Sequence, residues 1–196
     1  MGWGGRFVSR PAVFLDRDGV INRDRHDYVK SVEEFEFLHG VPEAVCRLSR
    51  GGYAVVIVTN QSAVGRGLLG FSEVRAIHDL MLEGLSAAGG AVEEVRFCPH
   101  TPDDGCHCRK PRPGMLLDAA LEYDLDLRRS FLVGDAASDI EAASEAGCRA
   151  VLVETGRGRE QRLELERRGR TGFHVARDLT AAADWILSRF SRSVAG

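Results

Sequence analysis

The 196-residue sequence lacks the features that mark a chain for a membrane, for export or for nucleic acid. No apolar run approaches the ~20 residues of a membrane-spanning helix, and the first residues lack the long apolar stretch of a signal peptide. An excess of one charge is also missing, because 26 basic and 29 acidic residues are mixed along the chain. No global field therefore attracts nucleic acid or an acidic membrane surface. We expect a cytoplasmic protein with neither kind of partner.

The five cysteines are unevenly placed, which argues against a disulfide framework. Cys98, Cys106 and Cys108 lie within one short segment, whereas Cys46 and Cys148 lie far away in apolar surroundings. We interpret the two isolated thiols as small core residues. The clustered thiols indicate a metal site.

Short apolar runs alternate with amphipathic stretches along the chain. Runs without polar alternation, as expected of strands buried on both faces, cover residues 12–15, 54–58, 131–133 and 150–153. Helical periodicity covers residues 41–48, 71–85, 115–123 and 139–146, and residues 173–175 and 179–190 predict a final strand and a closing helix. This order predicts one α/β domain over residues 1–196, with a Rossmann-like parallel sheet covered by helices on both faces.

Polar residues follow three of the predicted strands at the point where each strand ends. Asp16 and Asp18 follow the first strand, Thr59-Asn-Gln-Ser62 follows the second, and Asp135 follows the run 131–133. In open parallel sheets, ligands bind at the carboxyl ends of the strands. We therefore expect these three clusters to converge on one edge of the sheet.

Asp16 and Asp18 place two carboxylates two residues apart. Such acids repel each other, which favours a bound divalent cation or a proton-transfer role, and Asp135 would add a third oxygen ligand for magnesium. A capped turn is the alternative for Asp-x-Asp-Gly alone. The other clusters favour phosphoryl transfer, in which Asp16 attacks and Asp18 donates a proton. Thr59 would offer a hydroxyl, and Lys110 would offer positive charge.

Four candidate zinc ligands fall within eleven residues: Cys98, His100, Cys106 and Cys108. Three thiolates and an imidazole form a closed set suited to a tetrahedral structural zinc. A redox role for the cysteines is the alternative. His107 competes with His100, but we prefer His100, because the middle side chain of Cys-x-Cys points away from its neighbours. This zinc loop, residues 98–108, would present Arg109 and Lys110 to a phosphate.

Several motifs resemble those of the haloacid dehalogenase superfamily: Asp16-Arg-Asp-Gly-Val20, Val58-Thr-Asn60, Lys110, and Gly134-Asp135 with Asp139. Segments 14–22, 36–40, 59–62 and 98–111 further resemble one branch of that superfamily. This branch contains the D-glycero-D-manno-heptose 1,7-bisphosphate 7-phosphatases and the histidinol-phosphate phosphatases. The resemblance covers about residues 13–153.

The resemblance implies a magnesium-dependent phosphatase that forms a transient phosphoryl-aspartate on Asp16, with Asp18 as general acid and then base. It implies that magnesium is held by the carboxylates of Asp16 and Asp135 and by the backbone carbonyl of Asp18. Asp139 would support these ligands. The phosphoryl group would be held by Thr59 and Lys110, and the substrate would be contacted by Arg17, Asp24, Tyr28, Asn60, Gln61, Ser62 and Arg109.

The chain also departs from its relatives. Heptose bisphosphate phosphatases often carry lysine directly after the aspartate that corresponds to Asp135, where this sequence has Ala136. Only about forty residues separate Asp18 from Thr59, which leaves no room for the cap domain of many relatives. A loop with Asp24 and Tyr28, together with the zinc loop, would then close the site.

Two further features are ambiguous. We expect His26 to be an exposed loop residue, although loops are where substrate contacts concentrate. Gly65-Arg66-Gly67 can be interpreted as a phosphate cradle, but a flexible turn explains it equally well.

We expect the C7 phosphate of heptose 1,7-bisphosphate to be removed by a monomeric enzyme. Histidinol-phosphate phosphatase is the alternative, because it shares every motif and differs in the loops that recognise substrate. Hydrolysis of a nucleic-acid 3′-phosphate is disfavoured by the mildly acidic composition. A zinc-stabilised interaction module without activity would lack a nucleophile, acid, lysine or metal ligand, and all of these are present.

Overall fold

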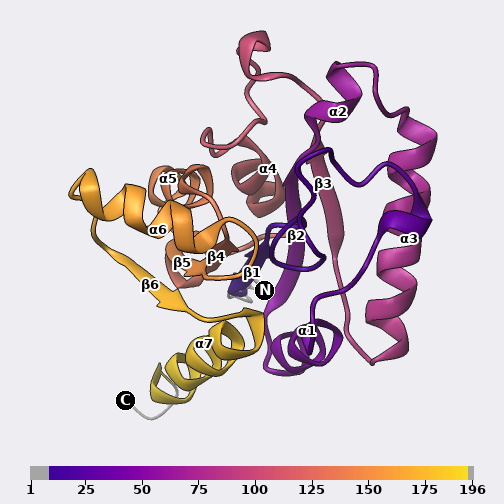
Figure 1. Ribbon diagram of the computed structural model, residues 1–196. Helices are drawn as coiled ribbons and strands as arrows, with labels where there is room; N and C mark the ends of the chain where they lie inside the picture. The colour runs from indigo at the N-terminus through magenta and orange to yellow at the C-terminus, as the bar shows by residue number, and fades with distance from the viewer. Residues whose placement is uncertain (1–8, 194–196) are drawn as a thin grey trace, which may run out of the picture.

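The computed structural model describes residues 9–193, which are organised around one parallel sheet (Figure 1). The strands are β1 (Ala12–Leu15), β2 (Ala54–Asn60), β3 (Glu94–Cys98), β4 (Phe131–Gly134), β5 (Arg149–Val153) and β6 (Phe173–Ala176). They lie in the order β3-β2-β1-β4-β5-β6, and every neighbouring pair is parallel. The predicted α/β fold is confirmed.

Helices connect the strands and cover the sheet. The α-helices are α1 (Val41–Arg50), α2 (Ser62–Gly65), α3 (Phe71–Ala87), α4 (Gly114–Glu122), α5 (Ala137–Ala146), α6 (Gly158–Arg167) and α7 (Leu179–Ser193), and the short 3-10 helices are η1 (Val32–Glu34), η2 (Pro102–Asp104) and η3 (Leu127–Arg129). The predicted helices coincide with α1, α3, α4, α5 and α7 to within a few residues at each end.

Two apolar layers, one on each face of the sheet, form the core. Along β1, Val13 and Leu15 pack with residues of α1, α3 and α7, whereas Ala12 and Phe14 pack with residues of α4, α5 and α6. All four side chains are fully buried, because successive side chains of a strand point to opposite faces. The non-alternating apolar runs thus belong to strands covered on both sides, as predicted.

The edge strand β3 is absent from the sequence prediction. Its residues alternate polar and apolar, with Glu94 and Arg96 between Val95 and Phe97, and all four are half-buried. An edge strand needs no continuous apolar run, because only part of it is covered. A search restricted to such runs therefore misses β3.

The sheet has its topological switch point between β1 and β4. The chain runs from β1 to β2 and β3 on one side of the sheet, and from β4 to β5 and β6 on the other. In sheets of this type, ligands bind in the crevice outside the carboxyl ends at that point. Asp16 follows β1 and Asp135 follows β4, so the fold brings the two aspartates to this crevice.

No inserted domain separates β1 from β2, since residues 16–53 form a loop, η1 and α1. Of the helices within residues 9–193, none has the length and apolar character needed to cross a membrane. The prediction of one domain over residues 1–196 stays a prediction, and its ends lie outside the described residues.

Candidate active site

The carboxyl ends of the central strands open into a cavity of about 600 Å³. Small-molecule sites typically occupy roughly 300–1,000 Å³. Most of the predicted site residues line it: Asp16, Asp18, Asp24, Tyr28, Thr59, Asn60, Ser62, Arg109, Lys110 and Asp135. The lining is completed by Arg25, His26, Arg66, Pro102, Ala136, Ser138 and Arg157. The sequence-based expectation that the polar clusters converge is therefore confirmed.

Three carboxylates and one lysine meet in the crevice. Oxygens of Asp16, Asp135 and Asp139 all lie within 4.8 Å of one another. Lys110 Nζ lies 2.9 Å from Asp16 Oδ1 and 2.6 Å from Asp139 Oδ1, and it donates to the Val58 carbonyl oxygen at 2.8 Å. Burial alone would lower the pKa of Lys110, but the two carboxylates outweigh burial and raise it. The ammonium group is therefore charged and fixed between them.

Burial and mutual repulsion make the carboxyl groups hard to ionise. Burial, with the charges of Asp139 and Asp18, raises the pKa of Asp16 to about 7, although Lys110 opposes the shift. Burial, with the charges of Asp16 and Asp139, raises the pKa of Asp135 to about 8. A divalent cation would offset this repulsion, and magnesium prefers carboxylate oxygens. The residues present fit a magnesium ion.

Asp18 is held by buried polar side chains. Nε and Nη2 of Arg17 donate to its carboxylate over 2.8–3.3 Å, and the side-chain amides of Asn22 and Gln61 donate at 2.9 and 2.8 Å. Burial alone would raise the pKa of Asp18, but Arg17 and the two amides outweigh it and hold the pKa below its ordinary value. Asp18 is therefore a carboxylate in the free protein.

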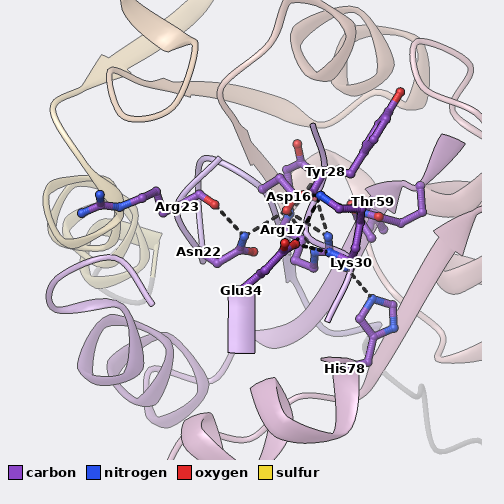
Figure 2. A network of polar contacts seen from close by, with 12 residues as sticks. Asp16, Arg17, Asn22, Arg23, Tyr28, Lys30, Glu34, Thr59 and His78 are labelled. Carbon is purple, nitrogen blue, oxygen red and sulfur yellow. Dashed lines mark hydrogen bonds and ion pairs between the residues drawn. The ribbon is translucent and has the colours of Figure 1, made fainter. Parts of the chain in front are cut away.

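The structure does not place Arg17 or Gln61 at the cavity, contrary to the expectation that both contact substrate. Arg17 is fully buried, and its guanidinium contacts the carboxylate of Asp18. The guanidinium also makes a hydrogen bond with His78 (Figure 2). Gln61 is 1% exposed and donates to both Asp18 and the hydroxyl of Thr59. Both side chains hold residues that line the cavity, and neither lies in the cavity lining itself.

Asn60 links the end of β2 to the segment that carries Lys110. Its amide nitrogen donates to the Lys110 carbonyl at 3.0 Å, and its amide oxygen accepts from the Lys110 backbone N–H at 3.1 Å. Thr59 is 1% exposed, and Ser62 begins α2. Although Asn60 lines the cavity, both ends of its amide are engaged by the backbone of Lys110.

The predicted zinc ligands form one cluster, in which the ligand atoms of Cys98, His100, Cys106 and Cys108 lie within 4.8 Å of one another. The Cys106 sulfur lies 3.6 Å from each of the other two sulfurs, close to the tetrahedron edge of about 3.8 Å that Zn–S bonds of ~2.3 Å imply. Burial raises the pKa of the Cys98 thiol to about 12, so its thiolate requires a cation. The donor set and spacing fit zinc.

His107 lies outside this cluster, as predicted. Its side chain is exposed, and Nε2 lies 3.4 Å from Asp118. Arg109 and Lys110 follow the last thiol directly, and Arg109 Nη1 donates to the His100 carbonyl oxygen at 3.1 Å. Arg109 and Lys110 thus connect the cluster of predicted zinc ligands to the cavity that both residues line.

Three residues without a predicted role also belong to the site or its support. Asn22 and His78 are buried beside Asp18 and Arg17, respectively. Arg157 lines the cavity, and its backbone N–H donates to Asp135 at 2.8 Å. Arg157 follows β5, so the rule about carboxyl ends of strands would have found it. Arg157 was not predicted because the charge-rich sequence that follows it is typical of an exposed surface segment.

Sequence comparisons identify a family model and several similar proteins. A family model described as HAD-hydrolase-like matches residues 107–182. A D-glycero-beta-D-manno-heptose-1,7-bisphosphate 7-phosphatase of Bordetella bronchiseptica is 46% identical over 176 residues, which are 89% of this chain and 97% of that protein. A D-glycero-D-manno-heptose-1,7-bisphosphate 7-phosphatase of Thermosynechococcus vestitus is 39% identical over 195 residues, with 94% and 99% covered.

The fold of the chain is also similar to that of a solved structure. The crystal structure of D,D-heptose 1,7-bisphosphate phosphatase from B. bronchiseptica, complexed with magnesium and phosphate, matches with a TM-score of 0.85 and 44% identity. The match covers 91% of this chain and 99% of that one. The chain therefore belongs to the haloacid dehalogenase superfamily and, within it, to the D-glycero-D-manno-heptose 1,7-bisphosphate 7-phosphatase family.

Proposed function

We propose that this protein is a magnesium-dependent phosphatase that removes the C7 phosphate of D-glycero-D-manno-heptose 1,7-bisphosphate. The observation that carries the proposal is the meeting of Asp16, Lys110 and Asp135 at one cavity. Asp16 and Asp135 would hold magnesium with the backbone carbonyl of Asp18, and Asp139 would support them. When bound, magnesium offsets the charge repulsion between a carboxylate and a phosphate.

The reaction has two steps. In the first, a carboxylate oxygen of Asp16 bonds to phosphorus, and the bond from phosphorus to the C7 oxygen breaks. The departing oxygen takes a proton from Asp18, while Lys110 and Thr59 hold the phosphoryl group. In the second, Asp18 takes a proton from a water molecule whose oxygen attacks phosphorus, which releases inorganic phosphate and restores Asp16.

The surroundings of Asp18 suit both of its roles. Its lowered pKa in the free protein favours the carboxylate that the second step needs. A phosphate dianion bound beside it adds negative charge, and a neighbouring negative charge raises the pKa of a carboxyl group. Substrate binding therefore favours the protonated form that the first step needs.

Two arginines are suited to the second phosphate of the substrate. Arg66 and Arg157 line the cavity with exposed side chains, and neither forms a salt bridge in the part of the chain whose side chains are described, although the charge of Arg157 acts on Asp24. Arg25, in contrast, is paired with acidic residues, and Arg109 donates to a backbone carbonyl. We propose that Arg66 and Arg157 bind the C1 phosphate.

Arg157 also bears on the missing lysine at Ala136. Its backbone N–H donates to Asp135, the residue directly before Ala136, and both Ala136 and Arg157 line the cavity. We propose that Arg157 provides the positive charge that Ala136 lacks. A cavity with free cations suits a bisphosphate better than histidinol phosphate, whose ammonium group these cations repel.

The experiment is phosphate release from both anomers of heptose 1,7-bisphosphate, fructose 1,6-bisphosphate, glycerol phosphate and histidinol phosphate, with magnesium. We expect one heptose anomer to have the highest kcat/KM, and we favour the β anomer named for the 46% identical relative. Product analysis should find the phosphate on C1.

Asp16→Asn is the control, because an amide cannot act as the nucleophile, and we expect at least about a thousandfold loss. Faster release from histidinol phosphate would contradict the proposed substrate. An active Asp16→Asn variant would contradict the phosphoryl-aspartate.

A further inference from the structure

Arg17 is the largest fully buried side chain of the described residues, and the two-step reaction assigns it no direct role. Its Nε and Nη2 contact the carboxylate of Asp18. Within residues 9–193, the hydrogen-bond partner of Arg17 Nη1 is Nε2 of His78, at a distance of 3.3 Å (Figure 2). The orientation of the guanidinium is therefore set from both sides, by an acid that lines the cavity and by a histidine that does not.

The chemistry of the contact fixes the state of His78. Arginine has only donors, so His78 Nε2 must accept, and the imidazole must be neutral. Burial, together with the charge of Arg17, lowers the pKa of His78 to about 4. His78 lies on α3 and is 6% exposed, and its ring packs against Phe97 of β3 in a T-shaped arrangement at a centroid distance of 5.5 Å. His78 is thus a rigid acceptor held between a helix and a strand.

The same arginine governs where Asp18 points. Nη2 of Arg17 contacts both carboxylate oxygens, at 2.9 and 2.8 Å, which fixes the plane of the carboxylate. The Asp18 side chain is still 24% exposed and lines the cavity. A general acid must lie within hydrogen-bond reach of the oxygen that it protonates, so its orientation affects the rate.

We propose that His78 is a positioning residue for protonation of the leaving group. Its neutral Nε2 holds the Arg17 guanidinium, which in turn holds the Asp18 carboxylate toward the C7 oxygen of the substrate. The inference rests on the proposed phosphatase function. His78 touches neither substrate nor metal ligand, so its influence passes through Arg17.

The test compares two leaving groups. An alkyl phosphate such as heptose bisphosphate needs a proton on the departing oxygen, whereas para-nitrophenyl phosphate releases a stable phenolate without one. His78→Leu should lower kcat/KM for the bisphosphate by about tenfold or more, because positioned acids contribute about 10²–10⁴. For para-nitrophenyl phosphate, the same variant should change kcat/KM by less than about threefold, since phosphoryl transfer to Asp16 then needs no acid.

Three variants separate positioning from packing. His78→Gln keeps an acceptor oxygen and should restore at least part of the loss on the bisphosphate. Met81→Leu changes a fully buried residue one turn along α3 and should leave both substrates unchanged. In an Arg17→Lys background, His78→Leu should add less than about twofold, because residues that act through one another are not additive.

Equal losses on both substrates, or no loss on either, would overturn the positioning role, and so would a full additional loss in the Arg17→Lys background. If wild-type protein does not release phosphate from heptose bisphosphate, the proposed substrate fails, and the leaving-group comparison is made with glycerol phosphate. A wild type that hydrolyses no alkyl phosphate would overturn both proposals.

Discussion

At the scale of single residues, two glycines bring separate loops against the Asp135 carboxylate. Gly19 has φ +82° and Gly156 has φ +54°, a region that favours glycine. A Cβ on either would overlap Oδ2 of Asp135, and a Cβ on Gly156 would also lie 2.6 Å from the Gly19 Cα. Close packing of the two loops thus fixes a carboxylate proposed to hold magnesium.

Gly156→Ala should therefore weaken magnesium binding. The added methyl group displaces Asp135, so we expect kcat/KM to fall by at least about tenfold at limiting magnesium, the loss typical of disturbing the support of a metal ligand. Phosphate release measured against magnesium concentration checks this result. The matched control is Gly169→Ala, which has φ +65° and nothing within 4 Å of the added Cβ. Equal behaviour of the two variants would contradict the role of packing at Asp135.

Sequence reasoning at this scale predicted which carboxylates lie together at the crevice, and their catalytic roles stay predictions. The meeting of Asp16 and Asp135 could be predicted, because both follow buried strands and the carboxyl ends of parallel strands share one edge of the sheet. Arg17 could not be placed correctly, because a charged residue between two site aspartates suggests contact with substrate. Its actual partner His78 lies sixty-one positions away, and no spacing rule relates the two.

At the scale of elements, the zinc loop joins a metal cluster to the cavity. Residues 98–108 supply the ligands, and Asn60 of β2 binds both backbone groups of the following Lys110. An element closed by four ligands keeps its shape without a hydrophobic core. The position of Lys110 therefore depends on the metal cluster and on β2 together.

Cys106→Ser should reduce zinc content, stability and activity in parallel. We expect the melting temperature to fall by at least roughly 6 °C, since losing a metal ligand costs more than about 2 kcal/mol in a chain of this size. Zinc content, a melting curve and phosphate release check the three effects. Cys148→Ala removes a thiol outside the cluster and should retain full zinc. Full activity in zinc-free Cys106→Ser would contradict the link between zinc and Lys110.

The elements themselves differ in how well sequence predicts them. The doubly covered strands β1, β2, β4 and β5 were found because burial on both faces requires continuous apolar runs. β3 was missed because polar and apolar residues alternate along it, with Glu94 and Arg96 forming an ion pair between the apolar residues. The edge of the sheet is set by tertiary contacts that a local pattern does not contain.

At the scale of the whole molecule, the strand order places the site. Asp16 and Asp135 are separated by more than a hundred residues, yet β1 and β4 are neighbours. General rules for parallel sheets predict this meeting without any knowledge of the contacts. Its consequence is a concentration of buried negative charge, which couples the stability of the fold to proton and metal binding.

The raised pKa values of two carboxyl groups determine whether stability rises or falls with pH. Asp16 and Asp135 have pKa values of about 7 and 8 in the fold, mainly through burial, against the ordinary value of 3.8. Between about pH 4 and 8 the folded protein therefore holds protons that the unfolded chain releases. Stability then falls as the pH rises through this window, because the folded state binds more protons.

Without magnesium, the wild type should lose stability relative to Asp135→Asn as the pH rises from 5 to 8, since the asparagine has no proton to lose. Magnesium requires the ionised carboxylates, so at a fixed concentration it should raise the melting temperature of the wild type more at pH 8 than at pH 5. Melting curves with zinc retained check both expectations. Equal stabilisation by magnesium at the two pH values would contradict the raised pKa values, and stabilisation of Asp135→Asn as strong as that of the wild type would show that magnesium binds elsewhere.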